Sequence, residues 1–441
     1  MPAGMILPVM ATIAFFPEGA YGPTNNCAGI GAVLRDRGHR VVFIIEESFA
    51  GTLQARGFEE RLMRLGPAPA QAEAPGQFWK DFIRDTASVF RRPTIEQLGA
   101  FIAPTFRALV DGARYVDARL EEIIDELAPD VIVQDNVVGF PALGASGRPW
   151  VRIVSCNPAE LKDERVPPVF SGYRTDDDVQ WPEYWEEYRR VLGPLHAEHD
   201  ECHRERGAGA LADLELIGTS PWLNMYLYPR ELDYRRATEP AGRWMTLESC
   251  VRTPEADWDP GSDPRPLVYL SLGSLGSSDV GLMQGLIDTL APCQDLRVIV
   301  SLGPQHELLS LPSHMEGAEY LPQTAILPHT AVAITHGGNN TVTECMHFGT
   351  PMVVLPLFWD QYDNAQRVFE LGYGARLSTY DHDPEQLIGV VRGLLADPAS
   401  PARLGTISQR LIRDPGTARA ADAIELVAAG ALSPAQLDLV E

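Results

Sequence analysis

Short apolar runs alternate with amphipathic stretches in two successive series along this chain. The first series predicts buried strands at residues 5–16, 40–45, 129–133 and 150–154, and helices at 26–37, around 52–56 and at 104–127. The second series predicts strands at 267–271, 296–301, 331–335 and 351–355, again with helices between them. Strands rich in Val and Ile that alternate with helices form a mostly parallel sheet covered on both faces. Each series therefore predicts one α/β domain.

The two series are separated by residues 238–266. This stretch contains five prolines and many Asp and Gly residues, and it lacks periodicity, which is typical of a linker. We therefore expect two doubly wound α/β domains facing a cleft, with a first domain over 1–237, a linker over 238–266, a second domain over 267–415, and a helical tail over 416–441 packed back on the first domain. Residues 176–206 are charged and aromatic, and they are expected to add surface helices to the first domain.

The charge balance limits the class of partner. The chain has 441 residues, with 36 Lys and Arg against 60 Asp and Glu, so its formal net charge is −24. Nucleic acids and anionic membranes are bound by positive surfaces, so this balance argues against either as a main partner. A phosphorylated small molecule is still compatible with it, because backbone N–H groups can supply the positive potential.

Cysteine usage and the first apolar run indicate the compartment. The six cysteines form no CxxC pair, and scattered reduced thiols are typical of a cytoplasmic protein. The run at 5–16 is too short to span a membrane, follows no basic region and is interrupted by Pro8. We therefore expect a cytoplasmic protein with no export signal and no membrane anchor.

A polar, glycine-rich turn between a predicted strand and a predicted helix is the first candidate site. The run THGGNNTVTE occupies residues 335–344. Glycines let the backbone approach a ligand closely, and first-turn N–H groups of a helix capped by Asn340 or Thr341 suit a diphosphate. The alternative is structural, because Thr341 and Glu344 also have the spacing of a capping box.

Two further turns follow predicted strands. The run LGSLGS at 272–277 offers N–H and O–H groups to phosphate, or forms a flexible turn. The run WDQYDN at 359–364 places Asp360 beside Gln361. An acid–amide pair suits vicinal hydroxyls, because the carboxylate accepts hydrogen bonds and the amide can both donate and accept. Alternatively, Asp360 only caps the following helix.

Taken in order, these motifs resemble the C-terminal half of the family 1 glycosyltransferases. The matching residues are YLPQ at 320–323, LPH at 327–329, THGGNNT at 335–341, Glu344, GTP at 349–351, DQ at 360–361 and Asn364. Weaker similarity extends to 267–277, to RGH at 37–39 and to PD at 129–130. The resemblance implies the GT-B fold, in which two Rossmann-like domains face a cleft and the second holds most of the nucleotide-sugar donor.

The same resemblance implies which residues hold a UDP-sugar. Tyr320 would stack on the base, beside the backbone of Leu321 and the side chain of Gln323. The diphosphate would be held by His336, Gly338, Asn340, Thr341 and Ser274. Glu344 would hold the ribose diol, and Asp360 and Gln361 would hold the hydroxyls of a hexose such as glucose. A deoxysugar lacking ring hydroxyls would leave these last two buried groups unpaired.

The catalytic base departs from the family pattern. Family members carry a Gly-His pair after the first strand, and its histidine deprotonates the acceptor. Counted back from Arg37, that position is Pro23, and no histidine precedes His39. The aspartate that normally orients the base is present as Asp135. We therefore expect Asp135 or Glu18 to act as the base, unless the acceptor is acidic enough to need none or the loop only shapes the acceptor pocket.

The resemblance implies an inverting transferase that moves a hexose from a UDP-sugar to a small natural-product acceptor, such as a macrolide, phenol or nucleoside. Loops within 60–100 and 155–235 are expected to form the acceptor pocket. No metal or other cofactor is expected, because the donor site has no Asp-x-Asp and a helix N-terminus faces the diphosphate. The alternatives are a nucleotide-sugar hydrolase or epimerase on the same fold, and a non-catalytic auxiliary that has lost its histidine.

Overall fold

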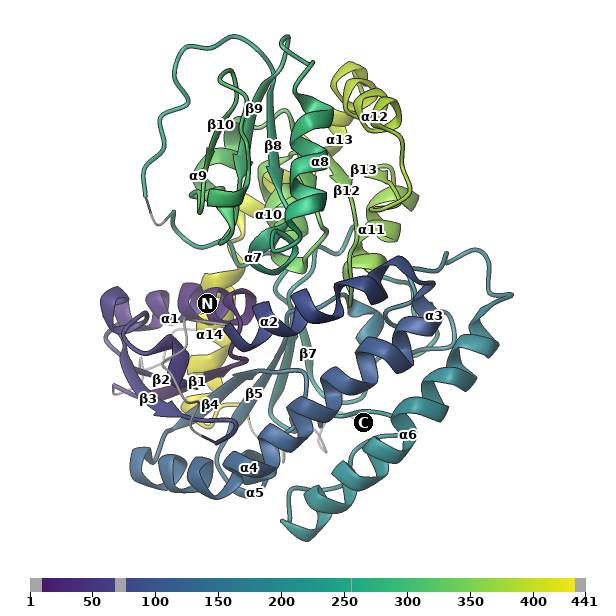
Figure 1. Ribbon diagram of the computed structural model, residues 1–441. Helices are drawn as coiled ribbons and strands as arrows, with labels where there is room; N and C mark the ends of the chain where they lie inside the picture. Colours follow the sequence, from purple (N-terminus) through teal and green to yellow (C-terminus); the bar gives the residue numbers. More distant parts are fainter. Residues whose placement is uncertain (1–9, 68–76, 255, 433–441) are drawn as a thin grey trace.

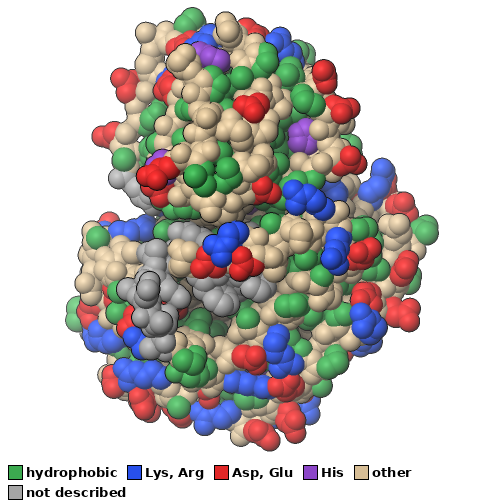
Figure 2. Space-filling view, in the orientation of Figure 1, with side chains coloured by type: hydrophobic (Ala, Val, Ile, Leu, Met, Phe, Trp, Pro, Cys, Tyr) green, Lys and Arg blue, Asp and Glu red, His purple; other side chains and the backbone are tan. Residues whose placement is uncertain are grey.

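The computed structural model describes residues 10–67, 77–254 and 256–432. Its ribbon has two lobes, each built on one parallel sheet with helices on both faces (Figure 1). The space-filling view shows the lobes meeting at a narrow waist, with acidic and basic side chains interspersed over the lower one (Figure 2). The predicted architecture of two doubly wound α/β domains is confirmed.

The first sheet has the strand order β3-β2-β1-β4-β5-β6-β7, and all neighbouring strands are parallel. The strands are β1 Thr12–Pro17, β2 Arg40–Glu46, β3 Glu59–Met63, β4 Val131–Asp135, β5 Trp150–Val154, β6 Leu223–Tyr226 and β7 Trp244–Thr246. The helices are α1 Tyr21–Asp36, α2 Gln77–Thr86, α3 Thr94–Gln97, α4 Ala103–Leu127, α5 Pro141–Ala145 and α6 Trp181–Glu205.

The second sheet repeats the same winding, with the order β10-β9-β8-β11-β12-β13. The strands are β8 Leu267–Ser271, β9 Arg297–Ser301, β10 Glu316–Ala318, β11 Val332–Thr335, β12 Met352–Val354 and β13 Gly374–Arg376. The helices are α7 Gly273–Gly276, α8 Val280–Leu290, α9 Gln323–Ile326, α10 Asn339–Phe348, α11 Gln361–Glu370, α12 Pro384–Ala396, α13 Ser400–Arg413 and α14 Gly416–Ala428.

Each sheet reverses its winding between its two central strands, β1 and β4 in the first and β8 and β11 in the second. In open α/β sheets, ligands bind beyond the carboxyl ends of the strands at this switch point. Every residue of β4 and β8 is buried, because helices cover both faces. The polar groups of these strands are therefore available to a ligand only at the strand ends, where the two lobes meet.

Several element boundaries differ from the predictions. Strand β1 spans Thr12–Pro17 instead of 5–16, whose residues 5–9 lie outside the described residues. Helix α1 begins at Tyr21, five residues before the predicted start at 26, because Pro23 is compatible with a first helical turn. Residues 52–56 form only a short 3-10 turn at Gln54–Arg56. The predictions omitted β3, because its sequence EERLM is mostly polar and only Glu60 and Met63 are buried.

Two segments with unusual composition belong to the first domain's core. The expected surface helices at 176–206 form the single helix α6, and its Trp181, Tyr184 and Tyr188 are buried against that core instead of lying on the surface. The expected linker at 238–266 contains β7, which pairs with β6 as the last strand of the first sheet. Short-range patterns missed both because burial here depends on contacts with distant elements.

Helix α14 returns from the second lobe to the first, where it runs beside α1 (Figure 1, yellow). Its Ala420, Ala421 and Ile424 are fully buried against the first sheet. Gly416 starts the helix where a Cβ would lie 2.2 Å from the carbonyl oxygen of Ser249, so the crossing requires glycine. The tail therefore covers one face of the first domain.

A buried histidine in α6 generates a testable pH dependence of stability. His199 is fully buried, its ring lies 4.6 Å from that of His203, and burial lowers its pKa to about 4. An unfolded histidine has a pKa of about 6.5, so the unfolded chain binds more protons below that pH. His199 therefore contributes stability that is fully present above pH 6.5 and is lost as the pH falls toward 4, by up to about 3 kcal/mol.

The variant His199→Phe keeps a ring at this position and removes its titration. Chemical denaturation between pH 7 and pH 4 should show a shallower fall in the free energy of unfolding than the wild type shows. His329→Gln, at an exposed histidine, is the control and should keep the wild-type slope. Equal slopes for wild type and His199→Phe would contradict the assignment.

Candidate functional site

The glycine-rich turn after β11 places a helix N-terminus in the cleft. Gly338 is the N-cap residue of α10, and no side chain caps the helix. Asn340 and Thr341, proposed as caps from the sequence, instead lie inside the first turn. Gly337 has a φ of +84°, and a Cβ there would lie 2.5 Å from Val354 Cγ1. The turn therefore requires glycine, and it leaves first-turn N–H groups free of side-chain caps.

The imidazole of His336 lies between the two central loops of the second domain. A Cβ on Gly273 would lie 2.6 Å from His336 Cε1, and one on Gly338 would lie 2.5 Å from His336 Nε2. Both glycines therefore make room for the ring, and Ser274 follows directly on the β8 side. Burial lowers the pKa of His336 to about 4, so the ring is neutral at pH 7 and can donate one N–H.

The residues expected at the base and ribose form a connected group beside α10. The Gln323 amide nitrogen donates to Glu344 Oε2 at 2.6 Å and to Thr341 Oγ1 at 3.3 Å. Arg252 donates to Glu344 Oε1 at 2.8 Å. Glu344 binds these side chains and not a backbone N–H of a capping box. Tyr320 is 52% exposed, so its ring has a free face, and Leu321 next to it packs on the domain core.

Asp360 and Gln361 lie where the second domain contacts the first. Asp360 Oδ2 accepts from the Asn157 N–H at 2.8 Å, and burial raises the pKa of this carboxyl to about 7. Gln361 Oε1 accepts from the Leu357 and Phe358 N–H groups at 3.0 and 3.3 Å. Within the described residues, Asp360 Oδ1 and the Gln361 amide nitrogen have no such partner. One polar atom of each side chain therefore remains for a ligand.

The α10 turn is bonded directly to the first domain across the cleft. The Asn340 amide nitrogen donates to the Gly22 carbonyl at 3.1 Å, and Asn26 donates to Asn340 Oδ1 at 3.0 Å. Gly22 and Asn26 belong to the first turns of α1. The N-terminal ends of α1 and α10 therefore face each other, each at the switch point of its own sheet.

The two candidate bases are adjacent at the switch point of the first sheet. Glu18 follows β1, Asp135 ends β4, and the Glu18 N–H donates to the Asp135 carbonyl at 2.8 Å. Ser155 Oγ donates to Asp135 Oδ1 at 2.7 Å, whereas Asp135 Oδ2 and Glu18 Oε2 are buried without a partner. Burial raises the pKa of each carboxyl to about 7. Each group therefore exchanges a proton near neutral pH.

A second set of contacts, missed from the sequence, joins the domains beside Asp360. The Asn157 amide nitrogen donates to Asn364 Oδ1 at 2.9 Å. The buried Asp363 carboxylate accepts from the Phe170 and Gly172 N–H groups at 2.7 and 2.8 Å. The sequence feature that could have identified Asn157 is its position as a polar residue soon after the end of a strand. Its partner on the other domain is not visible in any local pattern.

A cavity of about 350 Å³ opens between the domains beside the Gly273–Gly276 turn. Its first-domain wall includes Phe90 and Arg91, and its second-domain wall includes Asp279 and Tyr380. Arg91 lies 4.0 Å from the centroid of the Tyr380 ring, so a cation–π contact joins the two walls. This volume is within the range of small-molecule sites.

The described residues contain no group of three or more His, Cys, Asp or Glu side chains placed to hold a metal ion. None of their helices combines the length and apolarity needed to cross a membrane. All six cysteines are free.

The second domain matches a known family. Residues 285–426 match the family described as erythromycin biosynthesis protein CIII-like, C-terminal domain. The whole chain is similar to an oleandomycin glycosyltransferase of Streptomyces antibioticus, with 25% identity over 94% of this chain and 90% of the relative. It is also similar to a demethyllactenocin mycarosyltransferase of Streptomyces fradiae, with 26% identity over 97% of this chain and 87% of the relative.

Solved structures share the fold at lower identity. A glycosyltransferase of kitacinnamycin superposes with a TM-score of 0.68 at 23% identity, covering 95% of this chain and 99% of that one. A spinosyn rhamnosyltransferase complexed with thymidine diphosphate superposes with a TM-score of 0.62 at 18% identity, covering 94% of this chain and all of that one. The second domain is therefore similar to the C-terminal domain of that family, and the whole chain has the GT-B fold of these natural-product glycosyltransferases.

Proposed function

We propose that this protein is an inverting glycosyltransferase that moves a hexose from a UDP-sugar to a small natural-product acceptor. The observation that supports this most is the opposition of two groups across the cleft. The uncapped N-terminus of α10, with His336 beside it, lies on one side. The unpartnered carboxyl oxygens of Asp135 and Glu18 lie at the switch point of the other domain. One side suits a leaving diphosphate, and the other suits a hydroxyl that must lose a proton.

The proposed reaction is a single displacement. Asp135 Oδ2 accepts the proton of the acceptor hydroxyl, and the acceptor oxygen attacks the anomeric carbon. The bond from that carbon to the diphosphate breaks, and its electron pair leaves with UDP. First-turn N–H groups of α10 and the neutral His336 N–H stabilise the developing charge. Attack from the face opposite the diphosphate inverts the anomeric centre.

A nucleoside diphosphate deoxysugar is the second candidate donor. One similar enzyme is a mycarosyltransferase, and the similar spinosyn rhamnosyltransferase was solved with thymidine diphosphate. One oxygen of Asp360 and the side-chain oxygen of Gln361 are already used by backbone N–H groups, which reduces the hydroxyls this pair can recognise. Mass spectrometry of acceptor panels with UDP-glucose and with a TDP-6-deoxyhexose distinguishes the two donors. Release of nucleotide without a glycosylated product would indicate a hydrolase instead.

The diphosphate assignment is tested by His336→Ala. Loss of the N–H donor should weaken binding of free UDP about tenfold, because hydrogen bonds to charged groups contribute about 1.5–3 kcal/mol. Isothermal titration calorimetry measures this directly. His329→Ala, at an exposed histidine of the same domain, is the matched control. Unchanged UDP affinity in His336→Ala would assign the ring a structural role.

The sugar assignment is tested by Asp360→Asn. The substitution keeps an oxygen for the Asn157 N–H and removes the charge that would accept sugar hydroxyls. We expect kcat/KM for UDP-glucose to fall at least tenfold while the affinity for free UDP stays unchanged, as for a group that contacts only the sugar. Equal losses for UDP and UDP-glucose would refute the sugar contact.

The base assignment is tested by Asp135→Asn, which should lower kcat about 100-fold or more with little change in UDP binding. In the wild type, kcat/KM should rise with pH through about 7, because the base must be ionised. Glu18→Gln should move this rise of kcat/KM to lower pH, because the Glu18 charge raises the pKa of Asp135.

Ser155→Ala should move the rise of kcat/KM with pH to higher pH, because the Ser155 hydrogen bond lowers the pKa of Asp135. Glu18→Gln and Ser155→Ala therefore control for each other, because they change the pKa of Asp135 in opposite directions. Near-full activity of Asp135→Asn from pH 6 to pH 9 would exclude this residue as the base.

A further inference from the structure

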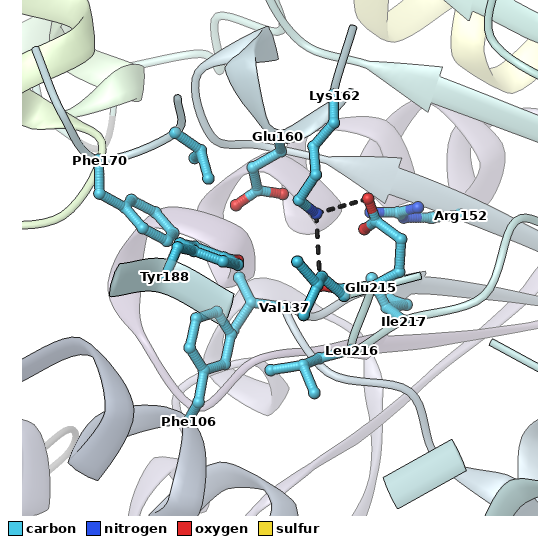
Figure 3. Close-up of a pocket in the computed structure, with 12 residues that line it drawn as sticks. Phe106, Val137, Arg152, Glu160, Lys162, Phe170, Tyr188, Glu215, Leu216 and Ile217 are labelled. Carbon is cyan, nitrogen blue, oxygen red and sulfur yellow. Dashed lines mark hydrogen bonds and ion pairs between the residues drawn. The ribbon is translucent and has the colours of Figure 1, made fainter. Parts of the chain in front are cut away.

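A small cavity in the first domain holds charged side chains that the proposed mechanism does not use. It lies between β5, α4 and α6, and its free volume is about 30 Å³, enough for about two water molecules. Figure 3 shows the rings of Phe106, Phe170 and Tyr188 along one side of this cavity. Lys162, Glu215 and Arg152 lie along the other side.

Arg152 is the unusual member of this group. It lies in β5 and is only 3% exposed. Within the described part of the chain, its guanidinium makes no hydrogen bond and no ion pair, and its Nε is buried without a partner. The centroid of the Trp244 ring lies 5.9 Å from it, and the carboxyl groups of Glu215 and Glu160 act on its charge without a hydrogen bond.

The other charges of the cavity are compensated. Lys162 Nζ pairs with Glu215 Oε1 at 2.5 Å (Figure 3, dashed). Burial raises the pKa of Glu160, and the Arg152 charge opposes this shift. A buried charge without a partner is unfavourable, and a guanidinium does not lose its proton in a protein. Burial lowers the pKa of Arg152 even though the charges of Glu215 and Glu160 oppose that shift, so the cavity holds an incompletely compensated cation.

The cavity borders the place where the acceptor and donor meet. When ionised, Glu160 raises the pKa values of both Asp135 and Asp360, so this side chain lies near both candidate groups. The rings of Phe106 and Phe170 also pack on Trp359, at 5.0 and 4.6 Å between centroids. Trp359 precedes Asp360 and has a φ of +59°, a conformation that is strained for a bulky residue. The aromatic side of the cavity thus continues to the interdomain contact.

We propose that this cavity binds a carboxylate carried by the acceptor, with Arg152 as its partner and the aromatic side packed on the adjoining ring. The identity of the ligand as the acceptor rests on the proposed function, whereas the carboxylate site itself does not. The planar guanidinium presents paired N–H donors that match a carboxylate. The free volume of the cavity can hold a carboxylate group but not a whole natural product. The acceptor class is therefore an aromatic or unsaturated acid.

Calorimetry without any nucleotide sugar tests the site, with 4-hydroxybenzoate and its methyl ester as probes. The wild type should bind the acid at least tenfold more tightly than the ester. Arg152→Gln should abolish this preference, and Arg152→Lys should retain part of it. Arg190→Gln, which removes the same charge from a 68% exposed position in α6, should leave the preference unchanged. Equal binding of acid and ester by the wild type would overturn the proposal without any variant.

Thermal unfolding separates a ligand site from a structural role. Without ligand, Arg152→Met should raise the melting temperature by a few degrees, because it removes an unpaired buried charge. A fall in melting temperature would mean that Arg152 stabilises the fold, and would overturn the proposal. Added 4-hydroxybenzoate should raise the melting temperature of the wild type only.

The outcomes also separate this proposal from the proposed function. An acid preference that depends on Arg152, without sugar transfer, would refute the transferase and keep the carboxylate site. Transfer to acids and esters at equal kcat/KM would keep the transferase and refute the site.

Discussion

Two parallel sheets face each other through the carboxyl ends of their central strands, and the cleft chemistry depends on this opposition. A parallel sheet covered on both faces can expose polar groups only at its ends. Asp135 and Glu18 lie at the switch point of one sheet, and the His336 loop lies at that of the other. Asn340 donates to the Gly22 carbonyl and accepts from Asn26, and these two hydrogen bonds hold the two ends together. A nucleophile and a leaving group can therefore be placed on opposite sides of one anomeric carbon.

Three of the buried polar atoms without a hydrogen-bond partner among the described residues lie where the proposed substrates would bind. Asp135 Oδ2, Glu18 Oε2 and the Arg152 Nε are all shielded from water and unpaired among the described residues. Each reduces the stability of the free protein, because an unsatisfied buried polar group keeps its desolvation penalty. A hydroxyl at the carboxyls and an anion at the guanidinium would remove that penalty. The stability of the free protein and its capacity to bind are thus linked at the same atoms.

A proline at position 23, where the resemblance implies a histidine, is compatible with the first-domain geometry. Pro23 begins α1 without disturbing it, since a proline is tolerated in a first helical turn. Asp135 keeps its place at the end of β4, and Ser155 holds one of its oxygens. Desolvation brings the pKa of this carboxyl to about 7, in the range that suits a general base. The proposed base therefore needs no histidine at position 23.

The sequence by itself determined the two α/β series, the glycine-rich turn at 335–341 and the absence of a histidine before His39, because each is a local pattern of residue types. Gln323, Thr341 and Glu344 were expected in one site, and they are hydrogen-bonded to one another. The tertiary structure alone decided that Trp181 and Tyr184 are buried, that Trp244–Thr246 completes the first sheet, and that Asn157 meets Asp360. It also decided that the buried Arg152 Nε has no hydrogen-bond partner among the described residues. Burial and pairing depend on residues far apart in the chain, and a local pattern carries no information about those distant contacts.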